Sequence, residues 1–533
     1  MNNDTKLDAL IVGAGFSGMY MLYKLRGMGF SARVVDAASG VGGTWYWNRY
    51  PGARCDVDSV YYSYSFDEDL EQEWEWTERY PSQPEILRYA NHVADRFELW
   101  PDIQLETRVA SASYEEAAAR WRVTSEAGDV FSAQFCIMAS GCLSSANMPK
   151  FDGLDDFAGR KFHTGRWPHE PVDFTGRRVG VIGTGSSGVQ AIQEIAGQAE
   201  HLTVFQRTPS YVVEAFNRPL GDDEQRNIKA HYQELRAAAK KTFGGFNTVM
   251  NDQSALSVSE REFRQRMEEA WNSGGIGFLA AFNDFGFHEE ANKRGQEFVR
   301  DKIRHAVDDP VTVEMLLPYH ILGCKRLCLG TNYYQTYNRP NVTLVQLGEG
   351  GVERITAGGL VTEGTEYPLD DLVMATGFDA MTGSLSRIDI RGRDGVPLAK
   401  AWEAGPRNYL GLMTNGFPNL FTITGPGSPS VLSNMMPTIE QHVEWISDCL
   451  GYLRAYKIRD MEANLDAQDA WVEHSNEIAS KTLRYSCSSW YLGANIPGKP
   501  RVFMPYIGGM PSYREKSAAV AAADYEGFEL RAE

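Results

Sequence analysis

Two glycine-rich turns, each between a short apolar run and a helical stretch, constrain the fold of this chain more than any other feature. The first lies in residues 10–18 (LIVGAGFSG) and the second in residues 179–188 (VGVIGTGSSG). Strand, G-x-G-x-x-G and helix form the unit that binds a dinucleotide. A single motif also occurs as an ordinary turn in α/β proteins. Two copies about 170 residues apart predict an α/β fold with two Rossmann-like dinucleotide-binding domains.

Each glycine in such a turn has its own physical task. The first lets the chain turn off the strand, the second lets a pyrophosphate approach the backbone, and the third lets the helix pack against the sheet. The helix N-terminus then presents free N–H groups to the phosphates. The predicted phosphate-binding residues are Gly13, Gly15, Ser17 and Gly18 in the first turn, and Gly183, Thr184, Gly185, Ser186, Ser187 and Gly188 in the second.

The strands that follow the two turns end in opposite charges. Residues 32–35 lead into Asp36, 23 residues after Gly13, where a carboxylate can accept hydrogen bonds from a ribose. Residues 202–205 lead into Arg207 instead, and an arginine suits a 2′-phosphate. We therefore predict FAD at the first unit and NADPH at the second. The alternative for Arg207 is a solvated surface charge.

Length and charge exclude several classes of protein. A chain of 533 residues is too long for one core and predicts two or three domains. The net charge of −18 disfavours nucleic acid and anionic membranes as partners. The polar first residues lack a signal-peptide core and no apolar run could span a bilayer, so we expect a cytoplasmic protein. Seven cysteines without a C-x-x-C motif are expected to be reduced thiols, with no disulfide and no metal site.

Composition changes along the chain suggest domain boundaries. We expect residues 1–141 and 378–533 to form a discontinuous FAD-binding domain, and residues 142–377 to form the NADP-binding domain. Charged helical sequence at about 221–309 predicts a helical insertion in the latter. Residues 372–379, an apolar run that ends in Ala-Thr-Gly, are expected to be a crossover strand that returns to the first domain.

Two further stretches could carry chemistry. Residues 42–56 (GGTWYWNRYPGARCD) are too rich in Gly, Pro and aromatics for regular structure, and their only carboxylate is Asp56. Beside a dinucleotide such a loop could wall a planar ring, although core packing is the alternative for its aromatics. Lys325 and Arg326 are adjacent cations in otherwise apolar sequence, which are either functional or simply solvated.

Residues 157–168 fit the pattern F-x-G-x-x-x-H-x-x-x-W-P through Phe157, Gly159, His163, Trp167 and Pro168. Residues 42–56 fit a second pattern, G-G-x-W-x-x-x-x-Y-P-G-x-x-x-D. With the two glycine motifs, the chain resembles type I Baeyer–Villiger monooxygenases from about Asp8 to Phe528. Residues 45–56 and 425–430 are most similar to the members that oxidise aryl ketones and steroids.

The resemblance implies an enzyme that uses FAD, NADPH and dioxygen to convert ketones to esters or lactones through a flavin C4a-peroxide, with possible sulfoxidation. It places the active arginine on Arg326 and its paired carboxylate on Asp56. A fixed cation beside the flavin would favour the negative charge that develops there, and a carboxylate would orient that cation.

The resemblance also assigns the remaining contacts. FAD is expected to contact Thr44, Trp45, Tyr46, Trp47, Arg54, Tyr62, Val109 and Met435 in addition to Asp36. NADP is expected to contact Arg207, Thr208, Lys325 and Trp490 in addition to the second turn. The substrate is expected to contact Cys142, Ser430, Val431 and Leu432. Members most like this chain usually carry glutamine where Cys142 stands, so no aryl-ketone preference is inferred. His163 is expected to be structural.

Two other functions are compatible with the same residues. A flavin monooxygenase could act mainly on sulfur or nitrogen, and a flavin-binding protein could lack turnover, although the presence of both Arg326 and Asp56 argues against the latter. The expected partners are a small ketone and dioxygen, with no nucleic acid and no membrane. We expect a monomer or a weak homo-oligomer.

Overall fold

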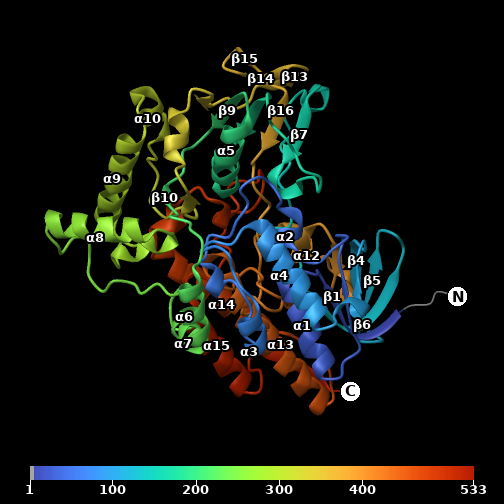
Figure 1. Ribbon diagram of the computed structural model, residues 1–533. Coiled ribbons are helices and arrows are strands. Elements are labelled where there is room, and N and C mark those ends of the chain that lie inside the picture. Colours follow the sequence, from blue (N-terminus) through green and yellow to red (C-terminus); the bar gives the residue numbers. More distant parts are fainter. Residues whose placement is uncertain (1–4, 533) are drawn as a thin grey trace.

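The computed structural model describes residues 5–532. They form two β-sheets whose central strands are parallel, with helices around them (Figure 1). The first sheet has the order β17-β4-β5-β6-β1-β2-β3, and β18 pairs with β6. Its strands are β1 (Thr5–Val12), β2 (Ala32–Val35), β3 (Ile103–Gln104), β4 (Val109–Glu115), β5 (Arg120–Ser125), β6 (Val130–Met138), β17 (Asp389–Arg391) and β18 (Leu420–Thr422). The last four residues of β1 are buried, as expected of a central strand covered on both faces.

Helices cover the first sheet, and the longer ones contribute to its largest hydrophobic core. They are α1 (Phe16–Gly27), α4 (Gln83–Arg96) and α13 (Met435–Ala455), with the short α2 (Thr44–Trp47), α3 (Glu68–Glu73), α11 (Gly383–Ser386) and α12 (Leu398–Ala401). Met19 and Leu22 of α1 and Val443 and Ile446 of α13 are fully buried in one cluster. The packing of α1 on α13 therefore holds the start of the chain against a helix more than 400 residues later.

The second sheet is entirely parallel, with the order β12-β9-β8-β16-β7. Its strands are β7 (Arg160–His163), β8 (Arg178–Ile182), β9 (His201–Gln206), β12 (Val342–Gln346) and β16 (Asp371–Met374), and α5 (Ser186–Gln198) connects β8 to β9. The strand β16 pairs with β7 and β8. We expected residues 372–379 to be a strand that returns to the first domain. They instead begin in an inner strand of the second sheet, and the chain crosses back to the first sheet after it. A three-stranded antiparallel unit, β13 (Arg354–Thr356), β14 (Gly359–Thr362) and β15 (Thr365–Pro368), leads into β16.

The predicted helical insertion lies between β10 (Val212–Glu214) and β11 (Cys328–Gly330), which pair in parallel. It contains α6 (Asp222–Ala230), α7 (Tyr232–Ala239), α8 (Glu260–Ser273), α9 (Glu289–Ala306) and α10 (Pro310–Leu316). Figure 1 shows α8, α9 and α10 to one side of α5, and α6 and α7 beside the first unit. Within residues 5–532, none of the helices is long and apolar enough to cross a membrane.

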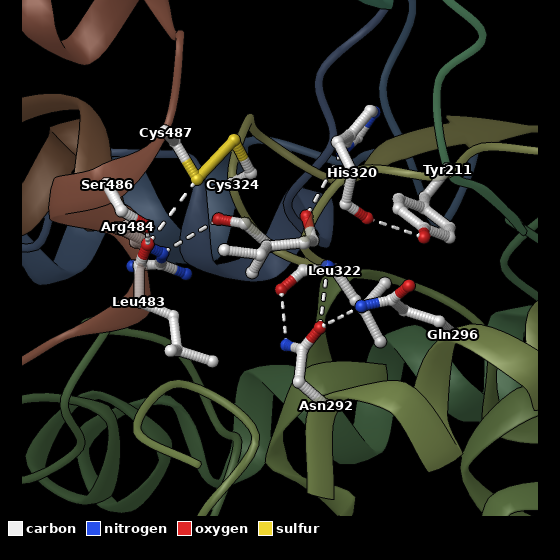
Figure 2. The surroundings of a disulfide bond; sticks show 12 residues. Tyr211, Asn292, Gln296, His320, Leu322, Cys324, Leu483, Arg484, Ser486 and Cys487 are labelled. Atoms are coloured by element: carbon white, nitrogen blue, oxygen red, sulfur yellow. Dashed lines mark hydrogen bonds between the residues drawn. A yellow bond between two sulfur atoms is a disulfide. The ribbon is translucent and has the colours of Figure 1, made fainter. Parts of the chain in front are cut away.

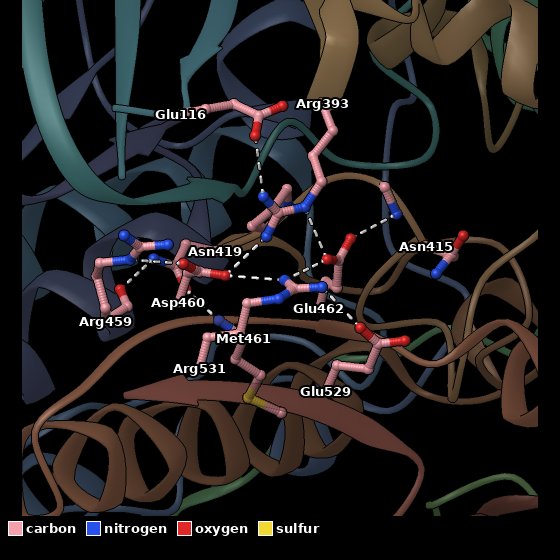
Figure 3. Close-up of polar contacts among 12 residues, drawn as sticks. Glu116, Arg393, Asn415, Asn419, Arg459, Asp460, Met461, Glu462, Glu529 and Arg531 are labelled. Carbon is pink, nitrogen blue, oxygen red and sulfur yellow. Dashed lines mark hydrogen bonds and ion pairs between the residues drawn. The ribbon is translucent and has the colours of Figure 1, made fainter. Parts of the chain in front are cut away.

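The last part of the chain is held by a network of arginines and buried carboxylates (Figure 3). It contains α14 (Leu465–Ser480), α15 (Met510–Ala522) and the antiparallel pair β19 (Ile458–Ala463) and β20 (Phe528–Ala532). The side chains of Asp460 and Glu462 on β19 are 0% and 3% exposed. Arg393 donates to them at 2.7 and 2.8 Å, and Arg531 donates to them at 3.0 and 2.5 Å. The two arginines therefore attach β20 and a distant turn to β19.

Candidate active site

A cavity of about 1280 Å³ is lined by residues from both units. Residues that follow the ends of β1, β2, β6, β9 and β16 line it, which is the carboxyl edge where parallel sheets bind ligands. The volume exceeds the roughly 300–1,000 Å³ of a typical single-ligand pocket. The cavity therefore has room for more than one ligand.

The two glycine turns have the same backbone geometry. Gly13 and Gly183 have φ of 116° and 104°, a region that side chains disfavour. Gly15 and Gly185 both have φ −78° and ψ −173° where α1 and α5 begin, and no side chain caps either helix. The first N–H groups of both helices are therefore free to bind an anion.

Both turns also have the space that a phosphate needs. A Cβ on Gly15 would come no closer than 3.5 Å to Gly43, and a Cβ on Gly185 would meet nothing within 4 Å. The third glycines, Gly18 and Gly188, lie beneath the turns instead, where a Cβ would collide with the carbonyl of the first glycine. The residues present thus fit two dinucleotides, and the third glycines contribute packing.

Asp36 and the pair Arg207–Lys325 give the two ends of the cavity different charges. The Asp36 carboxylate accepts from the N–H groups of Ala14 and Ala38 at 2.6 and 2.8 Å. Burial raises the pKa of Asp36, and these two bonds oppose the rise. Burial, and then the charge of Arg207, lower the pKa of Lys325. A lysine whose charged form is disfavoured by a neighbouring cation fits a site that binds an anion.

Arg326 and Asp56 form a bidentate ion pair on the cavity wall. The Nε and Nη2 atoms of Arg326 donate to Asp56 at 2.5 and 2.8 Å, and its Nη1 donates to the carbonyl of Val431 at 2.7 Å. Burial lowers the pKa of Arg326, but the attraction of Asp56 outweighs it and the net shift is upward. Three segments far apart in sequence thus fix one permanently charged guanidinium.

The predicted aromatic wall is partly present. Trp45, Trp47 and Tyr62 line the cavity, and the indole N–H of Trp45 donates to the Tyr62 hydroxyl at 3.0 Å. Tyr46 turns away and its hydroxyl lies 2.6 Å from Ser39 Oγ. Residues 44–47 also form the short helix α2, contrary to the expected irregular loop.

Gln190, on α5, joins the aromatic loop to the second unit, and sequence reasoning missed it. Its Oε1 accepts from the Tyr50 hydroxyl at 2.8 Å and its Nε2 donates to the Arg54 carbonyl at 3.1 Å. Gly52 lies so close that a Cβ would be 2.6 Å from the Gln190 carbonyl. A polar residue inside an amphipathic helix carries no motif that could have identified it.

His163 links the two chain crossings between the units. Its Nδ1 accepts from the Gly165 N–H at 3.0 Å, and its Nε2 lies 3.1 Å from the Thr376 hydroxyl, which donates to the Asn147 carbonyl at 2.7 Å. Burial lowers the pKa of His163, which favours the neutral ring that this geometry requires. The contacts are those of a structural residue.

Most of the predicted site residues line the cavity. Those that do are Gly13, Gly15, Ser17, Asp36, Thr44, Trp45, Trp47, Arg54, Asp56, Tyr62, Val109, Cys142, Trp167, Gly185, Ser186, Ser187, Arg207, Lys325, Arg326, Val431, Met435 and Trp490. Those that do not line it are Gly18, Tyr46, Phe157, Gly159, His163, Pro168, Gly183, Thr184, Gly188, Thr208, Ser430 and Leu432. Of the predicted substrate contacts, only Cys142 and Val431 face the cavity.

The expectation that every cysteine is a reduced thiol is wrong. Cys324 and Cys487 form a disulfide, with Cα atoms 5.8 Å apart and a sequence separation of 163 (Figure 2). The other five cysteines are free and buried. Spacing alone cannot pair cysteines so far apart in a chain.

Known proteins of similar sequence share this whole architecture. The family model for pyridine nucleotide-disulphide oxidoreductases matches residues 10–261. Acetone monooxygenase (methyl acetate-forming) of Gordonia sp. (strain TY-5) is 43% identical over 530 residues, covering 99% of each chain. Phenazine N-monooxygenase of Lysobacter antibioticus is 42% identical over 536 residues, covering 100% of this chain and 98% of its own. The structure of oxidised steroid monooxygenase bound to NADP is 50% identical, with a TM-score of 0.95 over 99% of this chain and 100% of its own.

Full-length identity at this level, together with the Arg326–Asp56 pair between two dinucleotide-binding units, defines the family. The chain belongs to the type I Baeyer–Villiger monooxygenases, which are FAD-dependent and use NADPH.

Proposed function

We propose that this protein converts small ketones to esters or lactones with NADPH and dioxygen. The observation that carries the proposal is Arg326, which Asp56 and the Val431 carbonyl fix on the wall of a cavity shared by two dinucleotide-binding units. FAD, when bound, supplies the reduced ring that activates dioxygen. Arg326 would stabilise the negative charge that develops on oxygen beside that ring, because its own charge is permanent and its position is fixed.

The two ends of the cavity would hold different cofactors. The first turn, Asp36, Trp45, Tyr62 and Met435 would bind FAD, and the second turn, Arg207, Lys325 and Trp490 would bind NADPH. This division supports an FAD-binding domain of residues 1–141 and 378–533 and an NADP-binding domain of residues 142–377, with the insertion at about 221–309. The support is the opposite charge at the ends of β2 and β9.

A small substrate would enter next to Cys142 and Val431. Both line the cavity, and Val431 is the residue whose carbonyl holds Arg326. The similar acetone monooxygenase acts on a small ketone by its name, which supports ketones of modest size. We further infer a cytoplasmic monomer or weak homo-oligomer.

Oxidation at nitrogen is the second candidate, because a phenazine N-monooxygenase is 42% identical over the whole chain. The same cavity and the same arginine could serve that reaction. The two candidates differ in the electronic demand on the oxidant, since a ketone needs a nucleophilic oxygen and an amine needs an electrophilic one.

One product screen separates these candidates. The purified protein is incubated with NADPH and air and with acetone, cyclohexanone, a steroid ketone, phenazine and a methyl sulfide. Esters or lactones from the ketones are the expected products. Formation of only N-oxide or sulfoxide would move the assignment to the second candidate, and NADPH consumption at the background rate with every compound would remove both.

A further inference from the structure

The disulfide joins the two loops that carry the predicted NADP contacts. Cys324 immediately precedes Lys325 and Arg326, and Cys487 lies three residues before Trp490. Both cysteines are buried, at 3% and 6% exposure. The covalent bond between Cys324 and Cys487 (Figure 2) therefore fixes the loop of Arg326 to the start of the loop that contains Trp490.

The far end of the second loop is attached to the first unit. Lys499 Nζ pairs with Asp379 at 2.6 Å and donates to the Ala380 carbonyl at 2.9 Å, and Asn495 Nδ2 donates to the Phe378 carbonyl at 2.8 Å. Between these contacts and the disulfide, Ser488, Ser489, Trp490, Ala494 and Asn495 line the cavity. Residues 488–495, which we call the strap, thus run along the cavity. The disulfide holds the N-terminal end of the strap, and polar contacts hold its C-terminal end.

Non-covalent contacts at the covalent end are weak substitutes for the disulfide. Arg484 Nε donates to the Gly323 carbonyl at 2.8 Å, and the Leu483 N–H donates to the Gly286 carbonyl at 2.9 Å. Arg484 forms no ion pair with a carboxylate within residues 5–532. Burial lowers its pKa, the charge that Tyr491 can carry opposes the shift, and the charge of Arg326 adds to it. Arg484 therefore holds the two loops together through a backbone carbonyl, without a carboxylate partner.

We propose that Cys324 and Cys487 are positioning residues whose disulfide holds the strap of residues 488–495 closed over NADP. A dithiol opens it by exchange: its thiolate attacks one sulfur, the S–S bond breaks, and its second thiol completes the transfer of two electrons, which leaves two protein thiols and an oxidised dithiol. In the dithiol form the two loops lose their covalent link and keep hydrogen bonds such as that of Arg484 to Gly323, so the population of the closed strap falls. The inference rests on the proposed NADP contacts of Lys325 and Trp490.

Thermodynamic linkage between NADP+ binding and reduction of the disulfide gives the proposal a measurable size. If the closed strap falls to about a fifth of the population on reduction, the apparent affinity for NADP+ falls about fivefold. By reciprocity, saturating NADP+ must then disfavour reduction of the disulfide by the same factor. A disulfide that only stabilises the fold would not obey this relation, because the affinity for NADP+ would be the same in the disulfide and dithiol forms.

The experiment uses the FAD-loaded wild-type protein before and after treatment with dithiothreitol. Thiols titrated in denaturant should number five before treatment and seven after it, because five cysteines are free and the chain has seven. The NADP+ dissociation constant from equilibrium dialysis should rise about fivefold on reduction. The equilibrium between the disulfide and dithiothreitol should shift about fivefold toward the disulfide when NADP+ is present.

Two variants provide the controls. The double variant Cys324→Ser with Cys487→Ser should bind NADP+ as the reduced wild type does and should not respond to dithiothreitol. Cys449→Ala removes a free thiol buried in the core of the first unit and should keep the full response. Seven thiols before treatment, or equal NADP+ affinity in both redox states, would overturn the inference. If the reduced protein still oxidises ketones and binds NADP+ with unchanged affinity, the proposed role of the disulfide is wrong but the proposed function stands. If the protein binds no NADP+ in either redox state, the assignment of the NADP contacts is wrong as well.

Discussion

Three hydrogen bonds hold Arg326 on the cavity wall. Replacing Arg326 with alanine should leave reduction of FAD by NADPH intact and lower ester formation at least about 100-fold, the typical loss for one electrostatic contact to the reacting oxygen. Stopped-flow absorbance measures the reduction, and gas chromatography measures the ester.

Arg326→Lys is the matched control for that change. It keeps the charge but loses the bidentate pair with Asp56 and the bond to Val431, so its rate should lie between those of the wild type and of the alanine variant. Ester formation at the wild-type rate by Arg326→Ala would show that another group stabilises the developing charge.

Lys325 predicts a pH dependence of cofactor binding. If Lys325 binds the 2′-phosphate as proposed, only its charged form does so, and burial together with Arg207 lowers its pKa below the ordinary value. Affinity for NADPH should therefore be complete at neutral pH and should fall as the pH rises through the lowered pKa, earlier than for an ordinary lysine. The KM for NADPH between about pH 7 and 10 tests this expectation.

Lys325→Arg supplies the comparison for the pH series. An arginine stays charged over the whole range, so its profile should be flat. If the KM for NADPH changes with pH in the same way in the wild type and in Lys325→Arg, a group other than Lys325 controls the binding.

At the scale of single elements, the attachment of β19 to β20 is the contact with the clearest energetic consequence. Removal of Arg393 by substitution with alanine leaves two buried carboxylates with Arg531 as their main partner. We expect a loss of about 1–3 kcal/mol in the free energy of unfolding, since Arg531 compensates part of the buried charge. Urea denaturation followed by far-UV circular dichroism measures it.

Arg391 is a control two residues away. Its pair with Asp389 is exposed at both ends, at 46% and 50%, and exposed pairs contribute less than about 1 kcal/mol. Arg391→Ala should therefore leave the urea midpoint almost unchanged. An equal loss in both variants would assign the effect to the local chain and not to the buried carboxylates.

Elements with strong local signals could be predicted from the sequence, and those set by distant contacts could not. The strand, turn and helix of each glycine unit follow from apolar periodicity and from glycines that need positive φ. The place of β16 depends on pairing with β7 and β8, which share no local pattern with it. The pair Arg326–Asp56 was predictable only through the resemblance, because 270 residues separate its members. Gln190 and the disulfide had no signal of either kind.

At the scale of the whole molecule, Gly52 is one of the residues at which the first unit touches the second. A Cβ there would lie 2.6 Å from the Gln190 carbonyl, so Gly52→Ala should push the aromatic loop away from α5. The distance between the two cofactor sites would change with it. We expect a raised KM for NADPH and fewer esters formed per NADPH consumed.

Gly29→Ala is the control for Gly52→Ala, because both substitutions place a side chain at the same backbone φ. Gly29 and Gly52 both have φ of 77°, but a Cβ on Gly29 meets nothing within 4 Å. This variant should lose stability without a change in the ratio of ester to NADPH. If both variants lower that ratio equally, contact between the units is not what couples the two cofactors.

The five free cysteines bear on how long such a catalyst lasts. All are buried, and burial raises the pKa of each thiol. Cysteine sulfur is oxidised through its thiolate, so these thiols resist hydrogen peroxide even where Cys55 and Cys142 border the cavity. Any peroxide that escapes from a failed turnover would therefore spare these cysteines on its way to solvent.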